Sequence, residues 1–235
     1  MTSNFAPLGG RPVPTLGGAG MAPAGDPVGG TSISPVMDYY IPQWEERTPY
    51  GFRRIDPYAK LFEDRIIFLG SPISDDVANA VMAQLLCLQS MDSSADINIY
   101  INSPGGSFTA LTAIYDTIRY IKPDVQTICL GQAASAAAVV LAAGKKGKRL
   151  ALPNSRILIH QPAVEGGSYG QASDIEVQAA EIFRIRQLLE KMIADNTGRD
   201  IDEVARDIER DKFLTADQAI EYGIIDEILP SLKVA

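Results

Sequence analysis

The chain contains a single histidine, His160, so any histidine-assisted nucleophilic chemistry depends on that residue. A neutral imidazole can take a proton from a serine hydroxyl and return it to a leaving group. His160 ends the apolar run RILIH, where a packed or surface histidine is the commoner outcome for this residue type. Acid–base chemistry at residue 160 therefore requires a serine and an acid beside it.

Two serines are candidate nucleophiles. Ser168 lies in GGSYG, a literal G-x-S-x-G, but that motif needs a strand leading into the serine and a histidine after it. The only histidine precedes Ser168, so we interpret this stretch as a Gly/Ser loop. Ser135, in GQAASAA, lies where a predicted strand ends and a helix of small residues begins. N–H groups at a helix N-terminus can stabilise an oxyanion, whereas the alternative role for Ser135 is an ordinary N-cap.

The sequence alone does not identify the other groups that a Ser135 nucleophile would need, namely an N–H donor for the oxyanion and an acid that orients His160. Gly105 and Gly106 follow another predicted strand and could bring an N–H group beside Ser135, or they could only form a turn with positive φ. Spacing does not select the acid that would orient His160. The conceivable residues are Asp174, Asp207, Asp211 and Asp226.

Strands alternating with helices predict an α/β fold that positions these residues. We expect strands at 65–69, 97–101, 125–130 and 224–229, and helices at 75–90, from the 103–106 turn to about 120, from about 135, at 201–208 and at 216–222. The segments 149–152 and 156–159 read as a strand pair across the turn at 153–154. A long helix is expected from Ser173, where SDIE resembles a capping box, to Thr197-Gly198.

Composition narrows the class of protein. The chain has 235 residues, 46% of them hydrophobic, and a net charge of −8, which argues against a nucleic-acid binder. The longest apolar stretch, 133–143, is shorter than the ~20 residues that span a bilayer. Cys87 and Cys129 form no metal-binding or disulfide pattern, and no secretory signal precedes them, so we expect a cytoplasmic protein.

The first residues differ from the rest of the chain. Residues 1–36 contain 14 Gly or Pro and only two charged residues, which predicts disorder. We therefore expect a disordered segment at 1–38 and one domain at 39–235.

Several motifs, in order, resemble the proteolytic subunit of the ATP-dependent Clp protease, ClpP. They are YINSPGG at 100–106, GQAAS at 131–135, GKR at 147–149, LPNSR at 152–156, IHQP at 159–162, ERDKFL at 209–214 and EYG at 221–223. The resemblance runs from about residue 40 to residue 229. It implies a ClpP/crotonase-like fold of repeated ββα units with a protruding strand-helix handle.

The resemblance also implies the chemistry. Ser135 would be the nucleophile, His160 the general base and Asp211 the acid that orients it. The N–H groups of Gly106 and Ala136 would form the oxyanion hole, although Ala136-Ala137 stands where the family usually has Met-Gly. The implied activity is that of a serine endopeptidase that cuts unfolded polypeptides, and it needs no metal or organic cofactor.

The resemblance further implies partners. Such subunits stack into two seven-membered rings, and a separate AAA+ unfoldase hydrolyses ATP; the GKKGKR run at 144–149 lacks the spacing of a phosphate loop. Unfoldase docking would involve Tyr100, Ile128 and Leu130, although Asn98 replaces a usual aromatic residue. Residues 1–38 would be a propeptide removed on maturation.

Two alternatives remain open at this point. The chain could belong to a mixed ring that is inactive without a paralogous partner, the extreme case being a purely structural subunit. A crotonase-like acyl-CoA enzyme would share the scaffold but would rely on carboxylates and a CoA groove, which a serine–histidine pair disfavours.

Overall fold

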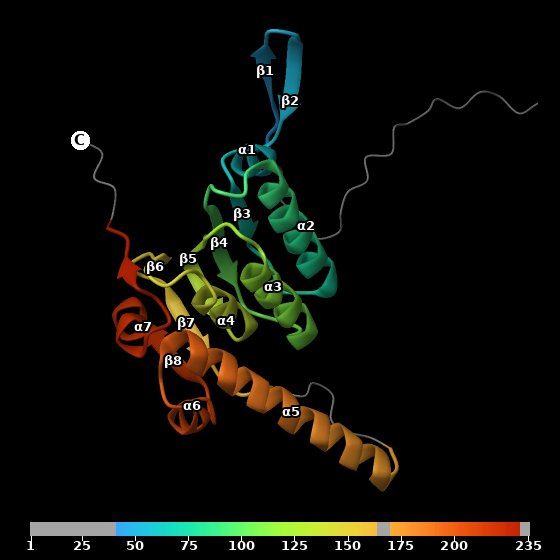
Figure 1. Cartoon of the computed structure of the whole chain (residues 1–235), viewed down its shortest axis with the longest axis vertical. Helices are drawn as coiled ribbons and strands as arrows, with labels where there is room; N and C mark the ends of the chain where they lie inside the picture. The colour runs from blue at the N-terminus through green and yellow to red at the C-terminus, as the bar shows by residue number, and fades with distance from the viewer. Residues whose placement is uncertain (1–40, 164–169, 231–235) are drawn as a thin grey trace, which may run out of the picture. The chain divides into compact units, whose positions relative to one another are not determined.

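A computed structural model describes residues 41–163 and 170–230 of the chain (Figure 1). The segment predicted to be a propeptide, 1–38, lies outside the described residues, as does Ser168.

The largest unit of the fold is a mostly parallel sheet, which confirms the predicted α/β class. Its main path has the order β3-β4-β5-β6-β9, and all of these neighbours are parallel. The strands are β3 (Ile66–Leu69), β4 (Ile97–Ser103), β5 (Val125–Ala134), β6 (Arg149–Ala151) and β9 (Glu227–Ile228). Two further strands, β7 (Arg156–Ile159) and β8 (Lys212–Thr215), continue the sheet from the far end of β5.

The predicted pairing of the 149–152 and 156–159 segments is wrong. Both strands run parallel to β5, β6 beside residues 127–129 and β7 beside residues 132–134. A hairpin turn would reverse the direction of the chain. Pro153-Asn154 instead keeps the direction and connects β6, beside the first half of the ten-residue β5, to β7, beside its second half. Ser155 secures this step, since its hydroxyl donates a hydrogen bond to the carbonyl of Cys129.

Other boundaries also differ from the sequence prediction. Strand β8 was not predicted, and β9 covers only two of the six residues expected at 224–229. The long helix α5 (Ala172–Thr197) is capped by Gln171 and Asp174 rather than beginning at Ser173. The Asp174 carboxylate accepts a hydrogen bond from the Gln171 N–H, which closes the capping box at Gln171. The helix ends as predicted at Gly198, whose φ is 79°.

Three helices cover one face of the sheet (Figure 1). They are α2 (Asp75–Met91), α3 (Phe108–Tyr120) and α4 (Ala136–Ala142). Ile97, Ile99 and Ile101 point into this core and are completely buried, consistent with the period-2 alternation of a strand. Every residue of α4 is buried, and its small side chains let it lie directly against the sheet.

The remaining elements lie around this core. A hairpin is formed by β1 (Trp44–Thr48) and β2 (Gly51–Ile55), followed by α1 (Pro57–Glu63), and α6 (Ile201–Asp207) and α7 (Ala216–Tyr222) complete the C-terminal part. Helix α5 extends away from the other elements in Figure 1. Its buried residues are confined to its C-terminal half, whereas Val177 and Phe183 in its N-terminal half are exposed. Within the described residues, no helix combines the length and the apolar character needed to cross a membrane.

Candidate active site

Ser135 occupies a strained position at the junction of β5 and α4. Its φ is 55° and its ψ is −123°, and only one other described non-glycine residue, Arg65, has a positive φ. Such a conformation costs on the order of 1–3 kcal/mol and is found at functional sites. The Ser135 N–H donates to the Leu158 carbonyl at 2.8 Å, which holds the junction against β7. The Ser135 side chain makes no cap hydrogen bond, so the ordinary N-cap role is wrong.

The two glycines after β4 lie against this junction. The φ of Gly105 is 92°, and a Cβ at that position would come within 2.5 Å of the Ala134 carbonyl oxygen and 2.7 Å of the Ser135 Cβ. No side chain fits there. The positive φ agrees with the turn that the sequence suggested, but it does not by itself account for a glycine at this position. Gly105 also allows the backbone to pass directly beside the serine.

The backbone N–H groups predicted for the oxyanion hole, those of Gly106 and Ala136, are not used by the neighbouring secondary structure. Gly106 forms a parallel bridge with Ile73, and this bridge uses the N–H groups of Ile73 and Ser107. The N–H of Gly106 therefore lies outside the bridge. Ala136 is the first residue of α4, where an N–H has no partner within the helix.

A pocket of about 690 Å³ brings four of the five predicted catalytic and oxyanion-hole residues together. Ser135, His160, Gly106 and Ala136 all line it, at the carboxyl ends of β4, β5 and β7. Ligands bind at this end of open α/β sheets. The rest of the lining includes apolar side chains suited to an extended peptide: Pro72, Phe108, Leu111, Pro162 and Leu189.

Asp211 and His160 each follow directly on one end of the antiparallel pairing of β7 and β8. The last pair in register is Ile159 with Lys212, and His160 and Asp211 are the next residues just outside this ladder. Within the ladder, Arg156 and Phe213 share one face, with the Arg156 guanidinium 4.6 Å from the centre of the Phe213 ring. Asp211 is exposed, and no hydrogen bond among the described residues joins it to His160.

The other three candidate acids are engaged elsewhere. Asp174 caps α5, and Asp207 accepts a hydrogen bond from Lys212. Burial opposes ionisation of Asp226, yet hydrogen bonds from Arg149 hold its pKa below the usual range. Among the described residues, Asp211 is therefore the one candidate acid without such a partner, and its role as the acid that orients His160 stays a prediction.

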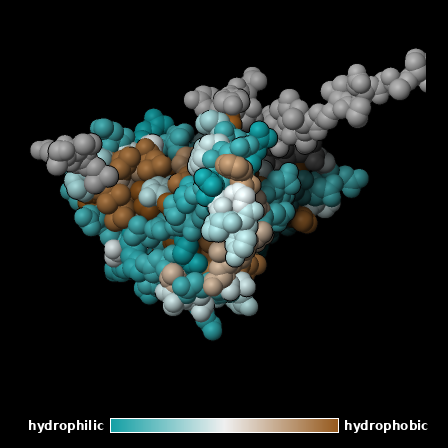
Figure 2. All heavy atoms as spheres, turned by 90° about the horizontal axis from the view of Figure 1, so that it is seen from above, coloured by the Kyte–Doolittle hydropathy of each residue, from teal (hydrophilic) through white to brown (hydrophobic). Residues whose placement is uncertain are grey.

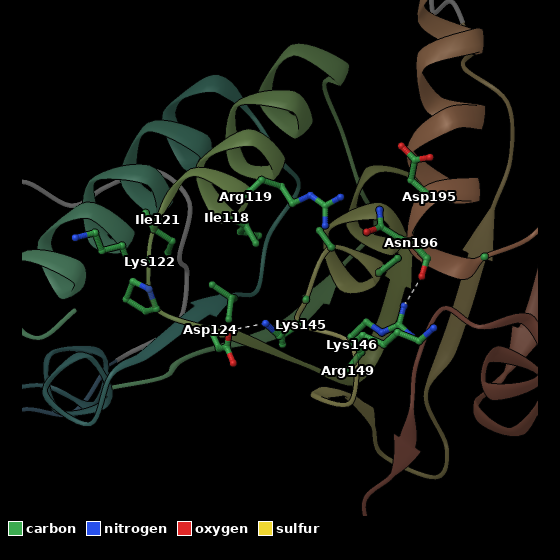
Figure 3. A pocket seen from close by; sticks show the side chains of 16 residues that line it. Ile118, Arg119, Ile121, Lys122, Asp124, Lys145, Lys146, Arg149, Asp195 and Asn196 are labelled. Atoms are coloured by element: carbon green, nitrogen blue, oxygen red, sulfur yellow. Dashed lines mark hydrogen bonds and ion pairs between the residues drawn. The ribbon is translucent and has the colours of Figure 1, made fainter. Parts of the chain in front are cut away.

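A second pocket, of about 460 Å³, lies at the opposite ends of the strands and contains none of the predicted site residues (Figure 3). It includes part of the lysine-rich run at 144–149. Lys145 pairs with Asp124 at 3.1 Å, and Lys148 pairs with Asp96 and Asp124. This run is therefore an ion-paired loop, consistent with the absence of a phosphate-loop motif.

The three residues predicted for unfoldase docking lie on the outward face of the sheet, opposite α2, α3 and α4. Cross-strand pairing places Phe68, Tyr100 and Ile128 in one row. Tyr100 and Leu130 are half-buried, whereas Ile128 is 1% exposed and lies beneath its neighbours. Gln126 donates a hydrogen bond to Asn98 at 3.0 Å on this face. Seen from above, apolar side chains gather in a patch toward the left of the molecule in Figure 2.

One contact of the site could not have been predicted from residue types in the sequence. The Leu158 carbonyl holds the Ser135 N–H, but any residue type supplies a carbonyl. Only the parallel pairing of β5 and β7 indicates it. Fold and site together define an α/β protein with the features of a serine hydrolase.

Comparisons with known proteins identify the family. The family model described as Clp protease matches residues 49–231. The chain is 66% identical over 213 residues to the ATP-dependent Clp protease proteolytic subunit 1 of Cutibacterium acnes, covering 91% of this chain and 94% of the relative. It is 57% identical to the proteolytic subunit 1 of Thermobifida fusca, covering 93% and 94%, and 62% identical to the proteolytic subunit 2 of Streptomyces coelicolor, covering 83% and 89%. The chain belongs to the Clp protease family, which confirms the resemblance, and is a serine peptidase.

Proposed function

We propose that this chain is a serine endopeptidase subunit that hydrolyses unfolded polypeptides to short peptides inside a ring-shaped chamber. The observation that carries the proposal is the strained, uncapped Ser135 in the same pocket as the only histidine. The relatives, named as proteolytic subunits of an ATP-dependent protease, support it.

In the proposed reaction, His160 takes the proton of the Ser135 hydroxyl as the serine oxygen attacks a peptide carbonyl. The N–H groups of Gly106 and Ala136 stabilise the oxyanion, and Asp211 orients His160 and stabilises its cation. His160 then donates the proton to the leaving amine. Water enters, loses a proton to His160 and hydrolyses the acyl-enzyme, which restores Ser135.

The proposed assembly consists of two stacked heptameric rings of this chain or of this chain and a paralogue, fed by an AAA+ Clp unfoldase that hydrolyses ATP. The unfoldase would dock on the outward sheet face near Tyr100, Ile128 and Leu130, and the protein would act in the cytoplasm. Residues 1–38 would form a propeptide ahead of a peptidase domain at 39–235.

One observation favours a second candidate, a subunit that is active only in a mixed ring. Asp211 is exposed in the single chain, and no hydrogen bond within the described residues ties it to His160. Contact with a neighbouring subunit could supply that alignment. The crotonase-like alternative receives no such support, since the relatives are proteolytic subunits.

The test is fluorophosphonate labelling of the full-length protein, with the modified residue located by peptide mass mapping. We expect labelling at Ser135 that is lost in Ser135→Ala and in His160→Ala, while Ser168→Ala is labelled like the wild type. Intact mass measured at the same time reports any cleavage near residue 38.

Labelling at Ser168 would contradict the proposed site. Labelling at Ser135 only after addition of a paralogous subunit would establish the mixed ring instead of the self-sufficient one. Failure to label under either condition would overturn the peptidase proposal.

A further inference from the structure

The residue after the histidine, Gln161, holds the two sides of the proposed catalytic pair together. Its backbone N–H donates to the Ile208 carbonyl at 2.7 Å, and its side-chain Nε2 donates to the Glu209 carbonyl at 2.9 Å. One residue next to His160 therefore binds two consecutive carbonyls of the segment that leads to Asp211. Among the described residues, these are the only direct hydrogen bonds between the two loops beyond the β7–β8 ladder.

Arg186 of α5 determines which way the Gln161 amide faces. Its Nη1 donates to Gln161 Oε1 at 2.7 Å, and a guanidinium can only donate. The amide nitrogen must then face the Glu209 carbonyl. Arg186 is itself fixed by Glu190 at 2.8 Å and by the Glu209 carboxylate at 3.0 Å, and its side chain is only 26% exposed.

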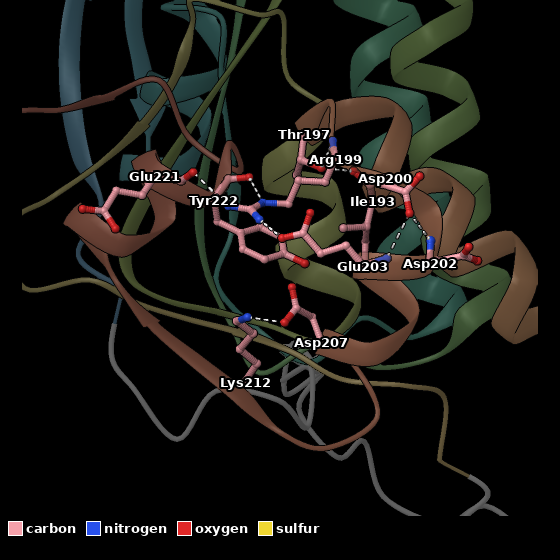
Figure 4. A network of polar contacts seen from close by, with 10 residues as sticks. All are labelled: Ile193, Thr197, Arg199, Asp200, Asp202, Glu203, Asp207, Lys212, Glu221 and Tyr222. Carbon is pink, nitrogen blue, oxygen red and sulfur yellow. Dashed lines mark hydrogen bonds and ion pairs between the residues drawn. The ribbon is translucent and has the colours of Figure 1, made fainter.

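A second anchor holds the other side of Asp211. Lys212 points to the inner face of β8, where its ammonium donates to Asp207 and lies 5.1 Å from the ring centre of Tyr222 (Figure 4). Because side chains alternate along a strand, anchoring Lys212 inward directs Asp211 outward, toward the face of His160.

We infer that Gln161, oriented by Arg186, is a positioning residue for the proposed Ser135–His160–Asp211 triad. Asp211 has no polar contact of its own within the described residues that sets its distance from His160, so its backbone must be held from both sides. Catalytic groups have to be placed within about 0.5 Å, and a displacement of about 1 Å can cost on the order of 100-fold in rate. The inference rests on the proposed peptidase function.

The test compares Gln161→Met and Gln161→Glu with the wild type in the ring in which the wild-type chain is active. Methionine keeps the length of glutamine without its hydrogen bonds. Glutamate keeps an acceptor for Arg186 but cannot donate to the Glu209 carbonyl. For both variants we expect kcat for a fluorogenic peptide to fall roughly 10- to 100-fold with KM within about twofold.

A pH profile separates positioning from general stability. A loosely held Asp211 stabilises protonated His160 less, so the acid limb of kcat/KM should move to lower pH in Gln161→Met, which adds no charge beside His160. Arg186→Met should show the same shift to a smaller extent. The matched control is Arg184→Met on the same helix, where Arg184 pairs only with Glu181 among the described residues, is 60% exposed and should leave both parameters unchanged.

The outcomes are distinguishable. If the wild type neither labels at Ser135 nor cleaves peptides in any ring, the proposed function fails and this inference fails with it. If the wild type is active while Gln161→Met and Gln161→Glu keep its kcat and pH profile, only the positioning role is overturned. Loss of activity that follows loss of ring assembly, with normal kcat per labelled site and an unmoved profile, would also overturn it.

Discussion

Ser135 and Gly105 lie so close together that a side chain at residue 105 would collide with Ser135. Ser135 adopts a φ of 55°, which most residues avoid, and the Gly105 backbone passes beside its Cβ with no room for a side chain. The backbone strain at Ser135 and the lack of space at Gly105 are therefore two separate constraints on this junction. A second glycine, Gly147, has a similar φ of 86° but nothing within 4 Å of the position of its missing Cβ.

We predict that Gly105→Ala abolishes labelling of Ser135, because the added methyl group would displace the Ala134 carbonyl or the serine itself. Gly147→Ala carries the same conformational strain, about 1 kcal/mol of unfolding free energy, without the crowding. Fluorophosphonate labelling and thermal unfolding of both variants check this. Equal labelling of the two alanine variants would mean that the junction relaxes around the methyl group.

At the scale of elements, a buried ion pair fastens the C-terminal part of the chain to the sheet. Arg149 on β6 is almost fully buried and donates to Asp226, just before β9, at 2.5 Å and to the Asn196 carbonyl of α5 at 2.8 Å. The Asp226 carboxylate also accepts from the backbone N–H groups of Gly147 and Arg149. Removing one partner of such a pair leaves the other charge buried and uncompensated.

We therefore predict that Asp226→Asn lowers the unfolding free energy by about 3 kcal/mol at pH 7. The pKa of Asp226 is lower in the folded than in the unfolded chain, so its contribution is present above about pH 4 and is lost as the pH falls through the folded pKa. Wild-type stability should decrease in that acid range, and the variant should show a flatter pH dependence. Urea unfolding at pH 7 and below pH 4, at one protein concentration, measures both.

The control is Asp195→Asn, which removes the exposed pair with Lys191 on α5 and should leave stability nearly unchanged. If Asp226→Asn were no more destabilising than this control, the Arg149 charge would have to be compensated by another interaction in the variant. The pair would then not be what fastens β9 and α5 to the sheet.

At the scale of the whole molecule, the two faces of the sheet differ. Helices α2, α3 and α4 bury one face, whereas the row through Phe68 and Tyr100 is partly open on the other, with Tyr58 edge-on to Phe68 at 6.0 Å. The proposed active-site pocket lies at the carboxyl ends of the strands, apart from this row. Docking of an unfoldase and cleavage of peptides should therefore be separable by mutation.

We predict that Tyr100→Ala lowers unfoldase-dependent degradation of a folded protein about tenfold, the effect of losing one aromatic anchor at an interface. Cleavage of a short fluorogenic peptide should stay within about twofold of the wild type. The matched control is Tyr120→Ala at the end of α3, where the tyrosine is 79% exposed and off this face. A normal rate of protein degradation by Tyr100→Ala would show that the unfoldase binds elsewhere, such as on a paralogous ring.

Much of this protein was predictable from local patterns in the sequence. Apolar runs and helical periodicity predicted α2, α3 and α7 almost to the residue, and the small residues after Ser135 predicted a buried helix. Because the chain has one histidine, the sequence by itself limited histidine-based chemistry to His160. The seven motifs from YINSPGG to EYG, taken in order, indicated the Clp protease family.

Only the tertiary structure decided which distant groups meet. β7 pairs with β5 and β8 rather than with β6, so the ends of β7 and β8 that lead to His160 and Asp211 are neighbours. Strand β8, KFLT, is too short to show a clear period. The roles of Gln161 and Arg186 depend on contacts between residues 25 positions apart, which no local pattern encodes. Local sequence determines the elements because backbone propensity and burial act within a few residues. The register between strands results from packing of the whole chain, so it is not encoded in any one segment of the sequence.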